Sequence, residues 1–581
     1  MRIASLVALL LVAGSVRGAE PSVTLTEAAP PYRDAARSLL ELIKHEANDK
    51  KLPSVAVALV DDQKVVWAAW VGAKPETIYR VGSVSKLFTD VAIMQLVEEG
   101  KLDLDSPVAK YVPEFKPAYK KGEQEITLRM LMAHRSGLIR EPPIGNYFDP
   151  TEPSLEKSVM SLNGIELVYP PGTRTKYSNA AIGLVGYVIQ KVQKEKFESY
   201  IQRRVLDLLD MESSSFTPTP AVKKNLAEAT MWTYHGREFP AATFELGVSP
   251  AGCMYSTVTD LAKFQSCLFA NGKVGKLRVL KPETIAEMFT PQFTKDGPRG
   301  FGLGFIIDEL EGKKRASHGG AIYGFATEFA MLPNEKLGAI VVSSRDVSNA
   351  VTTRIANDAL RLMLAAKEQR PLPKIEFPET IPLYQTEALV GRYRTPDRYF
   401  DITESFGRVF VQSDRGGSLL QLRRVGKHQL LLPGMGANPR LFQDQLIVDD
   451  VQGWGPTLLL DGDRAVLGNP LGKSPVYFKD RPQTTPPPEA PEKWKGLIGE
   501  YGWDHNTLYI YERDGKLHAL IEWVEIDPLT EESENVFAFP ADRGMYHGEK
   551  LVFTRDKTGR ATKVTAASVV FEPPQDRRRE R

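Results

Sequence analysis

The chain has 581 residues, of which 42% are hydrophobic and 25% charged, an ordinary globular composition with room for more than one buried core. Its 74 lysines and arginines almost balance 73 acidic residues, leaving a formal net charge of +1. No global field therefore draws the protein to nucleic acid or to an anionic membrane, and we expect a small-molecule or peptide substrate, with a cell-wall peptide as one option.

Residues 1–19 have the pattern of a cleavable secretory signal peptide. Arg2 precedes an apolar run from Leu6 to Ala13, and small residues follow as far as Ala19. The run is too short to span a bilayer, and no cysteine near its end could carry a lipid. We therefore predict a periplasmic or secreted protein with no membrane span.

The next segments predict a mixed α/β domain. Residues 54–60 and 65–71 are apolar and flank a polar turn, which indicates a buried β-hairpin. Apolar residues then recur at helical spacing from Val84 to Glu99, and Gly100 is a natural stop. Ser83 is thus expected at a helix N-terminus, and helical and strand patterns alternate as far as about residue 367.

The only cysteines are Cys253 and Cys267. Thr257 and Asp260 have the spacing of a capping box, so Cys267 is expected well along a helix that starts after Cys253. About 10 helical residues rise roughly 15 Å, too far for a bridge, and we predict two separate buried thiols.

Proline-rich breaks near residues 370–374 and 481–491 divide the chain into three parts, and the last two parts repeat each other. The segment Leu-Val-Gly-Arg-Tyr at 389–393 matches Leu-Ile-Gly-Glu-Tyr at 497–501, and both copies consist of short alternating segments. We predict tandem all-β, barrel-like modules from one duplication. The full division is a signal peptide 1–19, a hydrolase domain 20–368, a linker 369–382, a first β module 383–480, a linker 481–492 and a second β module 493–575.

Ser83 and Lys86 form an S-x-x-K motif at the start of the predicted helix. A spacing of three places both side chains on one helix face, where the lysine amine can take the proton of the serine hydroxyl. Ser154 and Lys157 also match the motif, but they follow a proline in a polar stretch, which favours an ordinary solvated helix start. We therefore predict Ser83 as the nucleophile and Lys86 as its base.

Two further clusters fit the same site. Tyr177 and Asn179 are presented from a turn at the head of a second helix, where the tyrosine can exchange protons and the amide can hold the lysine or a substrate carbonyl. His318 and Gly320 stand in a glycine-bearing strand whose edge can offer the Ala321 N–H to a carbonyl oxygen, with the Ser83 N–H as the other half of an oxyanion hole.

These motifs occur in the chain order of the class C beta-lactamase-like serine hydrolases, which include D-alanyl-D-alanine carboxypeptidases, D-aminopeptidases and esterases. Residues 131–138 (Leu-Met-Ala-His-Arg-Ser-Gly-Leu) and 250–261 also resemble segments of that family. The resemblance covers about residues 35 to 365 and implies an α/β sandwich with a helical subdomain and an acyl-serine intermediate. The β modules resemble those appended to certain D-aminopeptidases.

His318 stands where the beta-lactamases of this family have lysine. Because histidine is only partly charged near neutral pH, we expect weaker recognition of a substrate carboxylate, which favours amidase or esterase activity over beta-lactamase activity. No G-x-S-x-G elbow, metal-ligand spacing or phosphate loop is present, so no cofactor or metal is expected.

Two alternatives remain at this stage. The first is a catalytically silent protein that binds penicillins or peptidoglycan fragments, although Ser83 and Lys86 are both retained. The second gives the β modules a carbohydrate-binding role through aromatic residues that could otherwise form their cores: Tyr393, Trp454, Trp494, Trp503 and Trp523.

Overall fold

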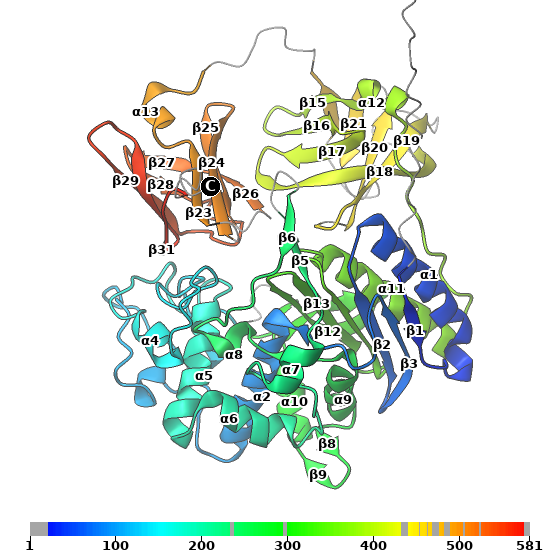
Figure 1. The fold of residues 1–581 in the computed structure, drawn as a ribbon, viewed down its shortest axis with the longest axis vertical. Helices are drawn as coiled ribbons and strands as arrows, with labels where there is room; N and C mark the ends of the chain where they lie inside the picture. Colours follow the sequence, from blue (N-terminus) through cyan, green and yellow to red (C-terminus); the bar gives the residue numbers. More distant parts are fainter. Residues whose placement is uncertain are drawn as a thin grey trace, which may run out of the picture.

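The computed structural model describes residues 21–232, 237–293, 299–430, 440–452, 454–461, 463–467, 476–480, 489–503, 506–521 and 525–574. The predicted signal peptide and residues 481–488 of the second predicted linker lie outside these ranges. Within them, none of the helices combines the length and the apolar character needed to cross a membrane. Figure 1 shows one larger domain with the two β modules above it.

The larger domain is built around an antiparallel sheet of eight strands. In spatial order the strands are β1 (Val23–Leu25), β3 (Lys64–Val71), β2 (Val55–Asp61), β14 (Leu337–Ser343), β13 (Phe325–Leu332), β12 (Lys313–Ile322), β11 (Ile306–Leu310) and β10 (Gly300–Phe301). The central strands β2, β13 and β14 are buried along almost their whole length because helices cover both faces of the sheet.

Alternate residues of β2 point to different cores, as the two-residue period of a strand requires. Val55, Val57 and Leu59 pack under α1 (Arg33–Asp49) and α11 (Asn349–Lys367), while Ala56 and Ala58 face the helical subdomain. The predicted hairpin therefore lies inside the sheet, between β1 and β14, and is buried between two layers of helices.

The helical subdomain surrounds α2 (Ser85–Glu98), which is buried on nearly every side. Its other helices are α3 (Leu128–Met132), α4 (Leu155–Met160), α5 (Asn179–Gln193), α6 (Phe197–Ile201), α7 (Pro220–Asn225), α8 (Ser249–Gly252), α9 (Val258–Phe269) and α10 (Pro282–Met288). Thr257 caps α9 by accepting the Asp260 N–H at 3.1 Å, and Cys253 and Cys267 are free, buried thiols. Ser154, the competing S-x-x-K serine, is the N-cap of α4 and accepts the Lys157 N–H.

The larger domain also contains short two-stranded sheets. They are β4 (Tyr79–Arg80) with β7 (Tyr255–Ser256), β5 (Thr230–Trp232) with β6 (Glu238–Pro240), and β8 (Lys273–Val274) with β9 (Leu277–Arg278). The first pair places the chain that leads into Ser83 beside the segment that precedes α9.

The first β module is a closed barrel preceded by α12 (Leu383–Leu389). Its strands are β15 (Gly391–Arg394), β16 (Tyr399–Ser405), β17 (Arg408–Ser413), β18 (Gly416–Leu430), β19 (Arg440–Asp449), β20 (Trp454–Asp461), β21 (Arg464–Leu467) and β22 (Val476–Lys479). The barrel confirms the prediction of a small all-β module.

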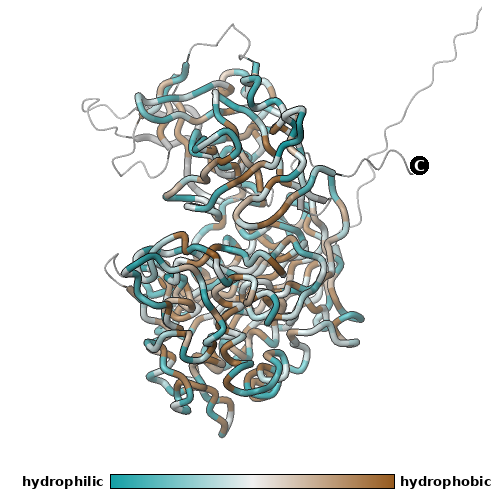
Figure 2. The backbone as a smooth tube through the Cα atoms, turned by 90° about the vertical axis from the view of Figure 1, so that its left-hand side faces the viewer, coloured by the Kyte–Doolittle hydropathy of each residue, from teal (hydrophilic) through white to brown (hydrophobic). Residues whose placement is uncertain are grey.

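The second β module begins at α13 (Glu492–Lys495) and contains two sheets. One sheet consists of β23 (Gly499–Trp503), β24 (Asn506–Arg513), β25 (Lys516–Ile521) and β26 (Glu525–Pro528). The other consists of β27 (Thr530–Ser533), β28 (Val536–Ala538), β29 (Lys550–Arg555), β30 (Ala561–Ala566) and β31 (Val569–Phe571). Figure 2 shows from the side that the part of the chain holding the β modules lies above the larger domain.

The two modules repeat the same local hydrogen bonds. The Tyr393 hydroxyl donates to Leu389 O at 2.9 Å, and the Tyr501 hydroxyl donates to Leu497 O at 2.7 Å. The Tyr393 side chain is 0% exposed and Trp494 is 7% exposed, so these two aromatics form part of the module cores, which is the alternative to sugar stacking that the sequence left open. Trp454 instead stacks on the guanidinium of Arg354 in α11, and the side chains of Trp503 and Trp523 lie outside the described residues.

Candidate active site

Ser83 lies in a single 3-10 turn (Gly82–Val84) between β4 and α2, at the helix start that the sequence predicts. Gly82 has a φ of 53°, and a Cβ there would lie 2.6 Å from the backbone nitrogen of Ala321. A Cβ on Gly320 would lie 2.0 Å from Val81 O. Only glycine at both positions lets the Ser83 turn lie directly against β12.

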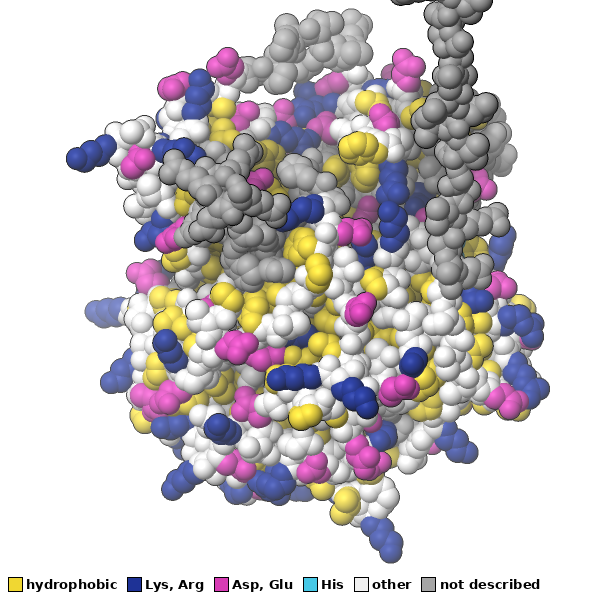
Figure 3. Space-filling view, in the orientation of Figure 1, with side chains coloured by type: hydrophobic (Ala, Val, Ile, Leu, Met, Phe, Trp, Pro, Cys, Tyr) yellow, Lys and Arg dark blue, Asp and Glu magenta, His cyan; other side chains and the backbone are white. Residues whose placement is uncertain are grey.

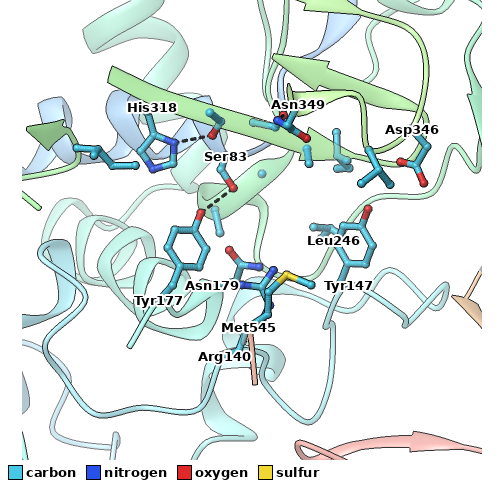
Figure 4. Close-up of a pocket in the computed structure, with 18 of the residues that line it drawn as sticks. Ser83, Arg140, Tyr147, Tyr177, Asn179, Leu246, His318, Asp346, Asn349 and Met545 are labelled. Carbon is cyan, nitrogen blue, oxygen red and sulfur yellow. Dashed lines mark hydrogen bonds between the residues drawn. The ribbon is translucent and has the colours of Figure 1, made fainter. Parts of the chain in front are cut away.

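Lys86 and Tyr177 both contact the Ser83 hydroxyl. Lys86 Nζ lies 2.9 Å from Ser83 Oγ, and the Tyr177 hydroxyl donates to the same oxygen at 2.8 Å. Lys86 is 1% exposed, and its amine also donates to Asn179 Oδ1 at 2.8 Å and to Ala251 O at 2.7 Å. Three acceptors therefore fix the lysine beside the serine, and Figure 4 shows Tyr177 directed at Ser83.

Asn179 is held in turn by Glu141, which is fully buried. The Asn179 amide nitrogen donates to Glu141 Oε1 at 2.5 Å, which leaves the amide oxygen facing Lys86. Ser178 caps α5 by accepting the Ala181 N–H, so the turn carrying Tyr177 and Asn179 is anchored to the helix. Sequence reasoning missed Glu141, which lies three residues after the recognisable segment 131–138.

His318 is buried at 2% exposure on β12. Its Nδ1–H donates to Gly319 O at 2.6 Å, an assignment that leaves Nε2 as an acceptor. Burial and the charge of Lys86 lower the pKa of His318 to about 4, so the ring is neutral near neutral pH. The sequence predicted a partly charged histidine, and the structure shows why this side chain carries no charge there.

Arg140 is the cation that sequence reasoning missed. It lines the same cavity as Ser83, with its guanidinium 5.4 Å from the Tyr177 ring centroid and 5.6 Å from that of Tyr546. The position of Arg140 just after the segment 131–138 could have marked it as a candidate site residue. Nothing in the sequence indicates that Tyr546 would cover it.

The cavity has a volume of about 560 Å³ and collects the predicted residues. Ser83, Tyr177, Asn179, His318, Gly320 and Ala321 all line it, whereas Lys86 lies behind Ser83 and is not part of the wall. β11 pairs with β12 only as far as Ser317, so among the described residues no strand pairs with residues 318–322 on that side. The Ser83 backbone lies beside this part of β12, since a Cβ on Gly320 would be 3.3 Å from the Ser83 nitrogen.

The second β module supplies part of the wall. Gly544, Met545 and His547 line the cavity and belong to the docking loop, which we define as residues 540–549. Lys176 next to Tyr177 forms a 2.6 Å ion pair with Glu549 and donates to His547 O at 3.0 Å. The sequence placed this module after the hydrolase domain but did not predict that it reaches the site.

The candidate site therefore combines an antiparallel sheet covered by helices with a serine, a lysine and a tyrosine hydroxyl that are joined by hydrogen bonds. The family model described as Beta-lactamase matches residues 39–362. The chain therefore belongs to the beta-lactamase family, whose members are generally serine hydrolases.

Individual relatives are more distant. Beta-lactamase-like protein 2 of Dictyostelium discoideum is 27% identical over 432 residues, covering 68% of this chain and 76% of the relative. Protein flp of Staphylococcus aureus strain N315 is 29% identical over 247 residues, covering 40% of this chain and 49% of flp. The octameric penicillin-binding protein homologue from Pyrococcus abyssi has the same fold, with a TM-score of 0.53 and 22% identity, over 85% of this chain and 99% of that one.

Proposed function

We propose that this protein is an exported serine hydrolase that cleaves an amide or ester through an acyl-Ser83 intermediate. The observation that carries the proposal is the pair of short contacts from Lys86 and Tyr177 to the Ser83 hydroxyl. Export is supported by the leader pattern of residues 1–19, and periplasmic or secreted localisation follows from it.

In the first step, Ser83 Oγ attacks the substrate carbonyl carbon. Its proton passes to the pair formed by Lys86 and Tyr177, and the carbonyl oxygen becomes an oxyanion. The N–H groups of Ser83 and Ala321 hold that oxyanion, and each such donor is worth about 3 kcal/mol or more in related chemistry. Asn179 keeps the Lys86 amine beside Ser83, and Gly320 keeps β12 close enough for the hole to form.

In the second step, the bond to the leaving nitrogen or oxygen breaks. The Tyr177 hydroxyl gives its proton to the leaving atom and recovers one from Lys86. The position of Tyr177 next to both Ser83 and Lys86 supports this role. Water then attacks the acyl carbon, and its proton passes through Lys86 and Tyr177 to Ser83 Oγ. The bond between Ser83 Oγ and the acyl carbon breaks, which releases the acid and free Ser83. His318 forms a neutral wall beside this path.

The test is intact-mass spectrometry of the mature protein after exposure to a fluorophosphonate and, separately, to a penicillin. We expect Ser83→Ala to abolish the fluorophosphonate adduct. Ser154→Ala is the matched control, because it removes the serine of the other S-x-x-K match at a cost of about 1 kcal/mol for the lost cap, and it should label normally.

A penicillin adduct on Ser83 would add beta-lactam recognition to the activity, whereas a fluorophosphonate adduct alone would favour amidase or esterase chemistry. Absence of both adducts on the folded protein would contradict the proposed hydrolase and favour a catalytically silent binding protein.

A further inference from the structure

Asn349 is a polar residue of the cavity wall to which the proposed chemistry gives no role. It is the first residue of α11, is half-buried, and lines the cavity that contains Ser83. Its Nδ2–H donates a hydrogen bond to Gly320 O at 2.8 Å. A carbonyl oxygen only accepts, so the amide nitrogen is the atom of the Asn349 side chain that faces it. Figure 4 shows Asn349 close to the strand that carries His318.

The carbonyl that accepts this hydrogen bond shares a peptide unit with the Ala321 N–H. A peptide unit is planar and trans, so its C=O and N–H bonds point in opposite directions. α11 packs on β13 and β14, and the Gly320 carbonyl is therefore turned toward the side of β12 that pairs with β13. The Ala321 N–H is turned the other way, to the side where no described strand pairs with residues 318–322.

The Ser83 turn lies against this part of β12. A Cβ on Gly82 would be 2.6 Å from the Ala321 nitrogen, and a Cβ on Gly320 would be 3.3 Å from the Ser83 nitrogen. The two N–H groups that the proposed mechanism uses as the oxyanion hole thus lie where the two segments meet. Asn349 holds one of them through the opposite end of its peptide unit.

The start of α11 is itself fixed to the sheet. The Ser348 hydroxyl, one residue before Asn349, shares a hydrogen bond with the Ser343 hydroxyl at the end of β14. Ser343 is the register partner of Ala326 in β13, and Ala326 is the register partner of Ala321 in β12. Asn349 is therefore anchored to the row of the sheet that contains Ala321, and its amide can keep the peptide in one orientation.

A hydrogen bond to the oxygen of a peptide unit strengthens the donor at its other end. It draws electron density toward the oxygen and makes the N–H more positive, an effect of about 10 to 30% per bond. Negative charge develops on the substrate oxygen during the attack by Ser83, and a fixed, polarised N–H stabilises that charge more than it stabilises the neutral carbonyl. The Asn349 contact therefore acts on the transition state more than on substrate binding.

We propose that Asn349 is a positioning residue that orients and polarises the Gly320–Ala321 peptide, so that the Ala321 N–H is preorganised as an oxyanion donor. This inference rests on the proposed acyl-Ser83 hydrolase and deepens it. Asn349 acts through the peptide unit and does not contact the reacting atoms.

The test uses the full-length mature protein, with p-nitrophenyl acetate as substrate and the fluorophosphonate adduct of Ser83 as a spectroscopic probe. Asn349→Leu keeps the approximate size of the side chain and removes the donor. We expect kcat to fall by about tenfold with KM little changed, less than the roughly 10²- to 10³-fold cost of losing a whole oxyanion donor. The 31P resonance of the phosphonylated protein should move toward that of the unfolded adduct, because the phosphoryl oxygen occupies the oxyanion hole.

Two further variants separate positioning from packing. Asn349→Asp keeps the shape of the side chain, but its ionised carboxylate only accepts, and an acidic residue at a helix N-terminus favours folding. It should lose kcat without losing thermal stability. Thr353→Val is the matched control one turn further along α11, because the Thr353 hydroxyl donates to Glu328 Oε2 at 2.9 Å rather than to Gly320. It should keep the kcat and the 31P resonance of the parent protein.

The outcomes distinguish this inference from the proposed function. A higher KM with unchanged kcat and an unchanged 31P resonance would overturn it, because Asn349 would then contact the substrate directly. Equal losses in Asn349→Leu and Thr353→Val would also overturn it and make Asn349 part of the packing between α11 and the sheet. Either result, with Ser83 still labelled, leaves the hydrolase intact, whereas absence of labelling in the unsubstituted protein rejects the proposed function and this inference together.

Discussion

The ion pair between Lys176 and Glu549 is expected to fasten the docking loop to the active site, and Glu549→Gln tests this. The two side chains are 0% and 3% exposed, and their charged atoms lie 2.6 Å apart. Glu549 also accepts the Arg140 backbone N–H at 3.2 Å. Replacing the carboxylate by an amide therefore removes a charge that serves two segments of the hydrolase domain.

The expected loss of stability in Glu549→Gln follows from two opposing electrostatic effects. Charges 2.6 Å apart attract by about 6 kcal/mol at an effective dielectric constant of about 20. Burial lowers the pKa of Lys176 and raises the pKa of Glu549, which shows that desolvation opposes both charges. Removing one partner leaves the other charge buried, and the expected loss of stability is about 3 to 5 kcal/mol.

The assay is urea unfolding together with limited proteolysis and kcat/KM. We expect Glu549→Gln to expose the second β module to protease and to lower kcat/KM, because the docking loop lines the cavity. The double variant Lys176→Met with Glu549→Met should recover most of the stability, since no buried charge remains. Glu531→Gln, which breaks the exposed pair with Lys493 at 2.7 Å, should cost about 1 kcal/mol or less. A Glu549→Gln variant as stable as the parent protein, or a double variant no more stable than Glu549→Gln, would refute the reasoning.

Further substitutions test other parts of the structure. Lys86→Ala should lower kcat by roughly 10²-fold or more, measured by single-turnover kinetics, and a change in KM alone would contradict its role as base. His318→Lys should raise the preference for carboxylate-bearing substrates over their amides by about tenfold or more, and an unchanged ranking would remove position 318 from recognition. Phe148→Ala should destabilise the second β module by about 3 to 5 kcal/mol in urea unfolding, because Phe148 of the hydrolase domain belongs to that module's core; coincident unfolding curves would contradict this. The pKa of His318 is lowered to about 4 in the folded protein. As the pH falls below about 6.5, the His318 imidazole therefore binds a proton in the unfolded chain before it does so in the folded protein. His318 should therefore contribute up to about 3 kcal/mol of stability above that pH and lose it toward pH 4, and His318→Gln should flatten this part of the stability profile.

Local sequence patterns predicted the elements that carry the site. The hairpin, the helix after Ser83 and the glycine-bearing strand each have their own periodicity, and the structure brings Ser83, Lys86, Tyr177 and Asn179 into one hydrogen-bonded group. Their catalytic roles, the signal peptide and the segment boundaries stay predictions. The fold class is confirmed, including the closed barrel.

The residues that the sequence did not reveal depend on contacts between distant segments. Arg140 and Glu141 follow a recognisable segment, but only packing shows that one lines the cavity and the other orients Asn179. Asn349 begins an ordinary helix, and no motif marks it as part of the cavity. The net charge of +1 does not indicate where charged side chains gather. On the face of the molecule visible in Figure 3, basic and acidic side chains are interspersed.

The docking loop also has a consequence for the order in which the protein becomes competent. Lys176 and the His547 carbonyl are 371 residues apart in the chain, and closing so long a loop is entropically costly until both partners are already folded. The hydrolase domain, with Ser83 and Lys86 in place, can therefore form before the cavity receives its last wall. During synthesis or refolding, reactivity toward a small acylating probe should precede discrimination between substrates, and the interval between the two measures the docking of the second β module.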